Sequence, residues 1–140
     1  MTKIQGQTTS CPNAISQRAS IAALLGDHRP IDDMKEQFRN RRTVMFDELS
    51  ALPNVHCSMP GGAFYMFPDF SFYLNKKTKN DKILQDTFDL SDYILDTAKV
   101  VTVPGDGFGA KGHLRFSFAT NNEVIQKGVS AVREALEKLK

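Results

Sequence analysis

An arginine inside a predicted strand, directly behind a glycine-rich loop, points most clearly to chemistry in this sequence. The strand expected over residues 113–118 alternates between two faces. One face carries His113, Arg115 and Ser117, and the other carries Leu114, Phe116 and Phe118. A buried charge is costly unless it is paired, and a planar guanidinium suits a carboxylate or phosphate held by two parallel hydrogen bonds. We therefore predict that Arg115 binds an anionic group; the alternative is that it faces water or pairs with a structural acid.

The glycine loop itself matches G-x-G-x-x-G over residues 107–112, a pattern that also occurs in nucleotide-binding proteins. In a dinucleotide-binding fold the loop must open a helix, but here it opens a strand, so that reading fails. A kinase-type loop does lie between two strands, but the lysine expected in the next strand is missing, since the next lysine is Lys127 in the last predicted helix. Phosphate binding through the loop remains one alternative hypothesis.

Four helices are expected around this segment. The first runs from the Thr8–Pro12 region to about Leu25 and ends at Gly26, with Pro12 in its first turn. The second begins at Pro30 and ends before Pro53. The third covers residues 89–98. The fourth begins at Thr120, with Glu123 in its first turn; the two residues fit a capping box in which each side chain satisfies a free backbone amide.

Strands are expected over residues 55–58, 63–67, 100–103 and 113–118, with turn chemistry at Gly61 and Gly62 between the first two. Residues 75–82 are polar and lysine-rich and are expected to form an exposed loop. Strands that alternate with helices favour a two-layer α/β unit, in which helices cover a short mixed sheet.

Composition limits the classes of function. Hydrophobic residues make up 41% and charged residues 24% of the 140 residues, which is ordinary for a globular domain. A net charge of +2 gives no argument for nucleic acid or for an acidic membrane surface, and no apolar run is long enough to span a bilayer. Cys11 and Cys57 lack metal-ligand spacing, so we expect free thiols in a cytoplasmic protein without a metal site.

The segment PGDGFGAKGHLRFSFAT at 104–120 resembles the C-terminal signature of fold-type-I aminotransferases, which use pyridoxal phosphate (PLP); the nearest group is the aspartate/prephenate type. Three further segments resemble the same family in the same order: KIQGQTTSCP at 3–12, MPGGAFYMF at 59–67 and VVTVPG at 100–105. The resemblance implies that Arg115 grips the substrate α-carboxylate and that Phe108 lies over the substrate mouth. It also suggests that Gly61 and Gly62 let the backbone approach the substrate, although a plain turn would explain them equally well.

The sequence departs from this family at the cofactor. The Schiff-base lysine of such enzymes lies in a motif resembling S-[SA]-K, and none of the eleven lysines follows such a pair. Without that lysine, the cofactor cannot be bound covalently to the chain. We therefore expect a C-terminal piece of a PLP-dependent transaminase of amino-acid metabolism, inactive by itself and without catalytic residues of its own. Residues 1–26 would lead from a missing large domain, and residues 27–140 would be the small domain.

The resemblance implies an amino acid, aspartate or glutamate, and a 2-oxo acid as substrates of a homodimeric parent enzyme. An alternative is a naturally short, non-catalytic module that binds carboxylates or phosphates. The two hypotheses predict different native products, since only the first requires a longer chain.

Overall fold

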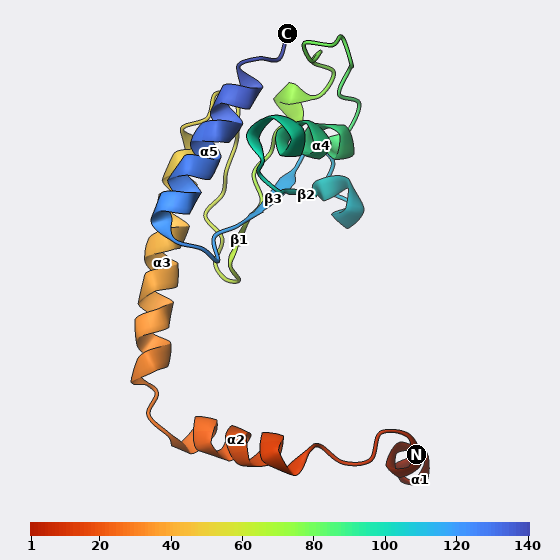
Figure 1. The fold of residues 1–140 in the computed structure, drawn as a ribbon, viewed down its shortest axis with the longest axis vertical. Helices are drawn as coiled ribbons and strands as arrows, with labels where there is room; N and C mark the ends of the chain where they lie inside the picture. Colours follow the sequence, from red (N-terminus) through yellow and green to blue (C-terminus); the bar gives the residue numbers. More distant parts are fainter. The chain divides into compact units, whose positions relative to one another are not determined.

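The computed structural model describes residues 1–140 and divides into two units, Met1–Lys35 and Glu36–Lys140, which are described separately. Figure 1 gives the labels of the elements. Helix α3, Arg29–Ser50, begins in the first unit and ends in the second. The sequence also predicts that residues 1–26 lead from a large domain and that residues 27–140 form the small domain. This boundary stays a prediction, because the large domain is not part of these 140 residues.

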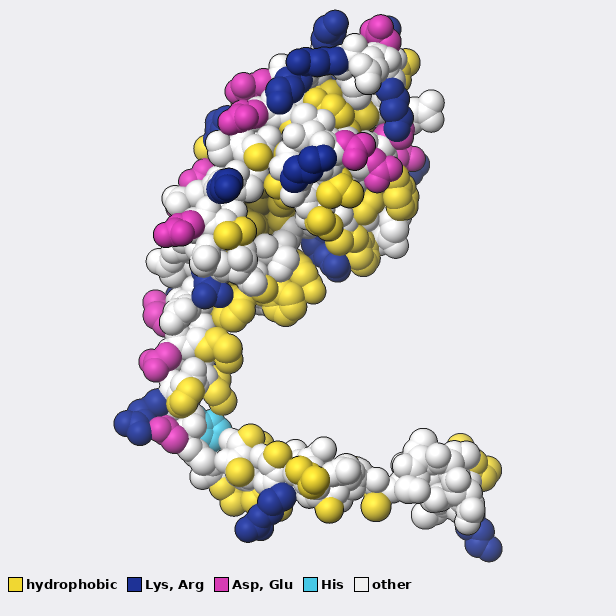
Figure 2. Space-filling model, in the orientation of Figure 1, with side chains coloured by type: hydrophobic (Ala, Val, Ile, Leu, Met, Phe, Trp, Pro, Cys, Tyr) yellow, Lys and Arg dark blue, Asp and Glu magenta, His cyan; other side chains and the backbone are white.

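The first unit contains two helices before α3, namely α1 (Thr2–Thr8) and α2 (Ala14–Leu25). The sequence predicted one helix with Pro12 in its first turn, but α2 begins later because the side chain of Asn13 accepts a hydrogen bond from the backbone N of Ile15 at 2.8 Å. The end at Gly26 is confirmed. No side chain of α1 or α2 is buried, and Figure 2 shows hydrophobic side chains along the visible face of α2.

The second unit holds a small sheet and the helices that cover it. Its strands are β1 (Tyr65–Met66), β2 (Val103–Pro104) and β3 (Leu114–Ser117). Its further helices are α4 (Thr87–Ala98) and α5 (Asn122–Leu136), with two short 3₁₀ turns, η1 (Ser71–Tyr73) and η2 (Gly105–Phe108). The predicted α/β class, the third and fourth helices and the strand behind the glycine loop are thereby confirmed.

The sheet has the order β1-β3-β2 and is antiparallel throughout, so the expectation of a mixed sheet was wrong. The predicted strands 55–58 and 63–67 do not pair with each other: β1 pairs with β3, and His56 forms a single bridge with Asp69. The turn at Gly61 and Gly62 therefore does not close a hairpin.

One face of the sheet packs on the helices. Phe116 and Leu114 of β3 are 4% and 0% exposed, and they pack in one core with Leu49 of α3, Ile94 of α4 and Val132 of α5. Burial along β3 alternates as the sequence predicted, because successive strand residues point to opposite faces.

Helix α5 lies beside α3, to one side of the strands in Figure 1. Arg133 Nη1 donates a hydrogen bond to the Ala51 carbonyl at 3.1 Å, and Asn122 Nδ2 donates one to Asn40 Oδ1 at 2.8 Å. The core therefore lies against the face of β3 that carries Leu114 and Phe116, and Arg115 lies on the other face.

The predicted capping box at the start of α5 is wrong. Asn121, not Thr120, is the N-cap, and its Oδ1 accepts a hydrogen bond from the backbone N of Val124 at 2.8 Å. Asparagine and threonine both cap helices, so residue types alone did not fix the first residue of the helix.

The structure also describes the two cysteines, possible metal ligands and the hydrophobicity of the helices. Cys11 is exposed and Cys57 is partly buried, and both are free in this structure. No group of three or more His, Cys, Asp or Glu side chains is placed to hold a metal ion. No helix combines the length and apolar character that crossing a bilayer would require.

Candidate functional site

Arg115 lies on the face of the sheet that points away from the core, close to two aromatic rings. Its Cζ is 4.3 Å from the centre of the Tyr65 ring and 5.1 Å from that of Phe108. Its Nε is buried and has no hydrogen-bond partner, and none of the four ion pairs of the structure includes Arg115. Of the two sequence-based alternatives, pairing with a structural acid is therefore wrong.

Strand register explains this arrangement. Tyr65 on β1 is the partner of Ser117 on β3, so Tyr65 lies diagonally across from Arg115 on the same face. Phe67 continues that face and meets the ring of Phe108 edge-on at 6.2 Å and the ring of His113 at 5.2 Å. The polar face of β3 is thus lined with aromatic rings contributed by β1 and by the glycine loop.

The glycine loop holds Phe108 through a compact set of backbone hydrogen bonds. Gly105 N donates to the His113 carbonyl at 2.8 Å, and Ala110 N donates to the Gly105 carbonyl at 3.0 Å. A Cβ at Gly105 would lie 2.4 Å from the Ala110 carbonyl oxygen and 2.5 Å from that of His113. Only glycine allows this close approach, so the loop depends on Gly105.

A carboxylate fixes the start of the loop. Asp106 Oδ2 accepts hydrogen bonds from the backbone N of Thr87, at 3.2 Å, and from the Thr87 hydroxyl. The hydrogen bond from the Thr87 hydroxyl is the main reason why the pKa of Asp106 lies below its ordinary value. The loop is therefore tied to the N-terminus of α4.

A second carboxylate lies beside the end of the loop. Asp69 Oδ1 accepts hydrogen bonds from the Ser71 hydroxyl at 2.5 Å and from the Ser71 backbone N at 2.8 Å. Burial favours a higher pKa for Asp69, but these hydrogen bonds, together with His113 and His56, hold its pKa below the ordinary value. Phe70 N donates to the Gly112 carbonyl at 2.7 Å, which joins this segment to the loop.

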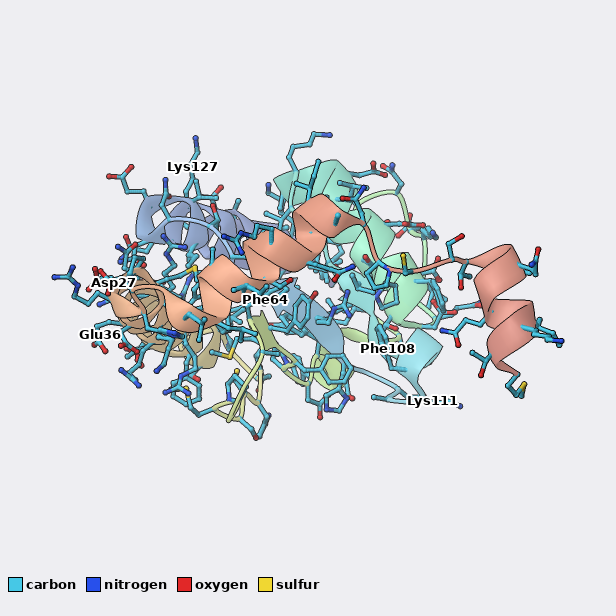
Figure 3. The ribbon with its side chains drawn as sticks, turned by 90° about the horizontal axis from the view of Figure 1, so that it is seen from below. Asp27, Glu36, Phe64, Phe108, Lys111 and Lys127 are labelled. Atoms are coloured by element: carbon cyan, nitrogen blue, oxygen red, sulfur yellow. The ribbon has the colours of Figure 1, made fainter.

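The geometry suits binding of an anion at Arg115. Ring faces attract a guanidinium electrostatically, and two of them restrict its orientation without using its N–H donors. The N–H donors at the end of the Arg115 guanidinium, which form a planar fork, are then free to bind a carboxylate or phosphate by two parallel hydrogen bonds. Figure 3 shows Phe108 and Lys111, a further cation, on the same loop.

The structure brings together two of the predicted site residues, Arg115 and Phe108. Gly61 and Gly62 lie exposed in the loop before β1, and no atom lies within 4 Å of the position that a Cβ of either would occupy. Arg42 Nη1 donates to the Pro60 carbonyl at 3.1 Å in the same loop. Whether these glycines approach a substrate stays a prediction.

Sequence reasoning missed two residues of this site, Tyr65 and Asp106. Tyr65 stands in the motif of residues 59–67, and the alternation of that segment could have placed it on the face of Arg115 once β1 was paired with β3. The contact between Asp106 and Thr87 joins residues 19 apart in the sequence and had no local signal.

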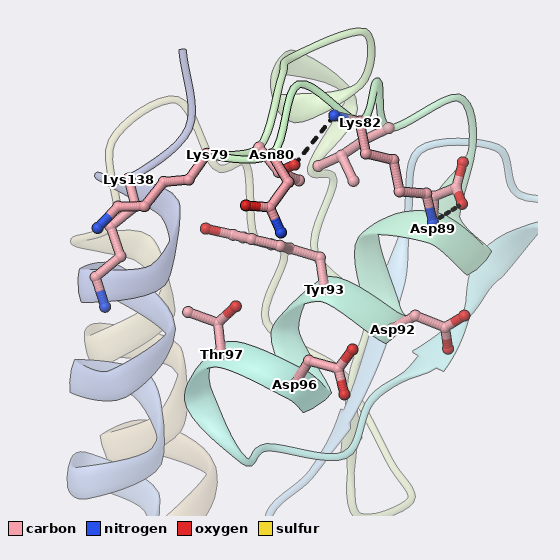
Figure 4. Close-up of a pocket in the computed structure, with 11 residues that line it drawn as sticks. Lys79, Asn80, Lys82, Asp89, Asp92, Tyr93, Asp96, Thr97 and Lys138 are labelled. Carbon is pink, nitrogen blue, oxygen red and sulfur yellow. Dashed lines mark hydrogen bonds and ion pairs between the residues drawn. The ribbon is translucent and has the colours of Figure 1, made fainter.

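A pocket of the second unit lies away from Arg115. It has a volume of about 450 Å³ and is formed by the 78–84 loop, α4 and Lys138, which follows α5 (Figure 4). Its charged residues are of both signs, and Lys82 already pairs with Asp89 at 2.7 Å. None of the residues around Arg115 lines it.

Comparison with known proteins identifies the family to which this chain is similar. The family model described as "Aminotransferase class I and II" matches residues 1–132. The chain is 38% identical to the aspartate/prephenate aminotransferase of Nitrosomonas europaea over 138 residues, covering 97% of this chain and 34% of that protein. It is 35% identical to an aspartate aminotransferase of Rhizobium meliloti, covering 99% of this chain and 34% of that protein. The chain thus spans about a third of the length of these relatives.

Solved structures agree with the sequence comparisons. The crystal structure of a Rhizobium meliloti aspartate aminotransferase matches 98% of this chain and 34% of its own, with a TM-score of 0.92 and 34% identity. The aspartate aminotransferase of Thermus thermophilus with maleate matches 95% of this chain and 32% of its own, with a TM-score of 0.79 and 30% identity. Since the family model covers nearly all of the chain and the fold agrees, the chain belongs to the class I and II aminotransferases.

Proposed function

We propose that this chain is the small, substrate-binding domain of a PLP-dependent aminotransferase that exchanges an amino group between an amino acid and a 2-oxo acid. The observation that carries the proposal is Arg115, a partly buried residue whose guanidinium lies close to two aromatic rings and whose buried Nε lacks a partner. In this proposal Arg115 binds the substrate α-carboxylate through its fork, and Phe108 covers the mouth of the site.

Positioning is the contribution that these residues make to the reaction. A carboxylate held at two points cannot rotate freely, so the bonds at the neighbouring carbon keep one orientation. Tyr65, Phe67 and Phe108 exclude water from one side of the ion pair, which strengthens the attraction between its charges. All of these groups bind and orient; none of them moves a proton.

The residues of this chain do not fit a PLP site. Ten of the eleven lysines are exposed and Lys76 is partly buried, whereas a Schiff-base lysine needs an environment that favours the neutral amine. Asp89 beside Lys82 even holds the pKa of that ammonium above its ordinary value. We therefore propose that the cofactor is held by residues outside these 140.

The proposed substrate class is a dicarboxylic amino acid, aspartate or glutamate, with its 2-oxo acid as the partner. Support comes from relatives named aspartate or aspartate/prephenate aminotransferases and from the Thermus thermophilus enzyme solved with maleate, a dicarboxylate. One arginine accounts for one carboxylate, so the group that binds the second carboxylate is proposed to lie outside this chain.

We propose further that residues 1–26 lead into a large domain. Helix α2 has no buried residue, and Ile15, Leu24 and Leu25 are all more than 70% exposed. Apolar side chains on all sides of a helix are typical of a helix that is buried by other parts of a protein. The resemblance to the family also leads us to propose that the complete protein is a homodimer.

The intact mass of the native gene product separates this proposal from its alternative. A mass several times 15.6 kDa supports a longer aminotransferase, in which the complete protein transfers amino groups from aspartate or glutamate and the 140-residue chain does not. A mass equal to that of this chain contradicts the proposal and favours a short module that binds carboxylates.

A further inference from the structure

Thr87, in the first turn of α4, anchors the beginning of the glycine loop. Its hydroxyl donates to Asp106 Oδ2 and accepts a hydrogen bond from the backbone N of Asp106 at 3.3 Å. Its backbone N also donates to Asp106 Oδ2, at 3.2 Å. Thr87 itself is fully buried, so the anchor on the helix side is rigid.

The first turn of α4 divides its free amides between two carboxylates. Asp86, the N-cap, accepts from the backbone N of Phe88 at 2.9 Å and of Asp89 at 3.0 Å. Asp106 takes the remaining amide, that of Thr87. Helix N-termini favour negative charge and leave amides without partners, so both carboxylates stabilise α4, but only Asp106 belongs to the loop.

Phe108 depends on this loop for its position. Its ring is 57% exposed and therefore has little core packing to hold it. It lies two residues after Asp106, within the same 3₁₀ turn, and Gly109 N donates to the Asp106 carbonyl at 3.1 Å to close that turn. A displacement of Asp106 would therefore move the ring that covers Arg115.

We propose that Asp106 is a positioning residue, which holds Phe108 against Arg115 and so fixes the orientation of the guanidinium that receives the substrate carboxylate. The inference deepens the proposed function and rests on it. Asp106 makes no contact with substrate in this scheme. It acts through Thr87, through the turn η2 and through the ring of Phe108.

Steady-state kinetics of the complete protein test this role, with Asp86→Ala as a matched control. Asp106→Ala is expected to lower kcat/KM for the amino acid by about ten- to a hundredfold, mainly through KM, because misplaced binding groups cost this much. Asp106→Asn keeps an acceptor oxygen and should restore most of the loss. Asp86→Ala removes the helix cap and should lower thermal stability while leaving kcat/KM within about twofold. Equal losses of kcat/KM in Asp106→Ala and Asp86→Ala would overturn the proposal.

A second measurement does not depend on enzymatic activity. In the 140-residue chain, the neighbouring rings should shift the NMR resonance of the Arg115 Nε–H group. The variant Phe108→Leu shows the chemical shift of this group when the Phe108 ring is absent. Asp106→Ala should move the resonance toward that of Phe108→Leu, and Asp86→Ala should leave it in place. An unchanged resonance in Asp106→Ala overturns the proposal. If the complete protein proves to have no aminotransferase activity, the proposed function fails and this spectrum alone decides the role of Asp106.

Discussion

The guanidinium of Arg115 lies over the face of Tyr65, with Cζ 4.3 Å from the ring centre, although the two residues come from strands 50 positions apart in the sequence. The contact exists because β1 pairs with β3 rather than with the segment before it. It gives the cation one aromatic neighbour, and the ring of Phe108 is a second, with its centre 5.1 Å from Cζ.

Tyr65→Leu is therefore expected to weaken binding of a carboxylate such as maleate to the complete protein. A cation–π contact contributes about 0.5–2 kcal/mol, which corresponds to an increase in Kd of about 2- to 30-fold. Tyr65→Phe keeps the ring face and serves as the control, with a Kd close to that of the unmodified protein. Calorimetric titration measures both, and an equal loss in the two variants would show that the ring face is not what matters.

The stability of the glycine loop is expected to depend on Gly105 and not on Gly107. A Cβ at Gly105 would clash with two carbonyl oxygens, whereas no atom lies within 4 Å of the corresponding position at Gly107. Gly105→Ala should lower the free energy of unfolding by about 1–3 kcal/mol, and Gly107→Ala should change it by less than about 0.5 kcal/mol. Urea denaturation of the chain compares them, and equal effects would contradict the loop geometry.

The N-cap of α5 gives a third prediction. Asn121→Ala removes the side chain that accepts from Val124 N and should destabilise the chain by about 1 kcal/mol. Thr120→Ala leaves that hydrogen bond intact and should cost clearly less. Urea denaturation of both variants decides between them; a larger loss for Thr120→Ala would favour the capping box that the sequence suggested.

The sequence predicted the elements of the second unit better than their pairing. The alternation of residues 113–118 predicted both β3 and its buried face, because side-chain direction follows from the strand period alone. The pairing of β1 with β3 joins Tyr65 to Ser117, and a contact across 52 positions has no local signal. The sheet was for this reason expected to be mixed rather than antiparallel.

The same limit applies to the site. Arg115 was predicted because a charge within a strand is a local pattern, and Phe108 was predicted from the family resemblance, which also gave both residues their roles. Asp106 was not predicted, because the proposed role of Asp106 depends on its hydrogen bonds with Thr87, which lies on a separate helix. Asn13 and Asn121 illustrate a smaller error, since neighbouring residues of similar capping ability shift a predicted helix start.

The tie between Asp106 and Thr87 predicts a dependence of stability on pH. Because the pKa of Asp106 in the folded chain lies below its ordinary value of 3.8, its ionised form stabilises the fold above that value. This contribution is lost as the pH falls through the lowered folded pKa. The difference in unfolding free energy between the unmodified chain and Asp106→Asn should be constant above about pH 5 and should shrink below 3.8.

The control for this prediction is Asp96→Asn, since Asp96 is an exposed residue of α4. Asp96 makes no side-chain hydrogen bond or ion pair, so Asp96→Asn shows the effect of removing one negative charge from α4 without breaking a contact. Urea denaturation at a series of pH values measures both variants. A difference for Asp106→Asn that grows as the pH falls below 3.8 would contradict the assignment of the lowered pKa.

The measurement that tests the central claim most directly is kcat/KM of the complete protein for aspartate or glutamate after Arg115→Lys, with Arg133→Lys as the control. Lysine keeps the charge but not the fork, and charge-assisted hydrogen bonds contribute about 1.5–3 kcal/mol each, so a loss of at least about tenfold is predicted. Arg133 lies on α5 and donates to the Ala51 carbonyl, away from the face of the sheet that carries Arg115, and its variant should stay close to the unmodified protein. Near-normal kinetics for Arg115→Lys would contradict the role of Arg115 in binding the substrate carboxylate.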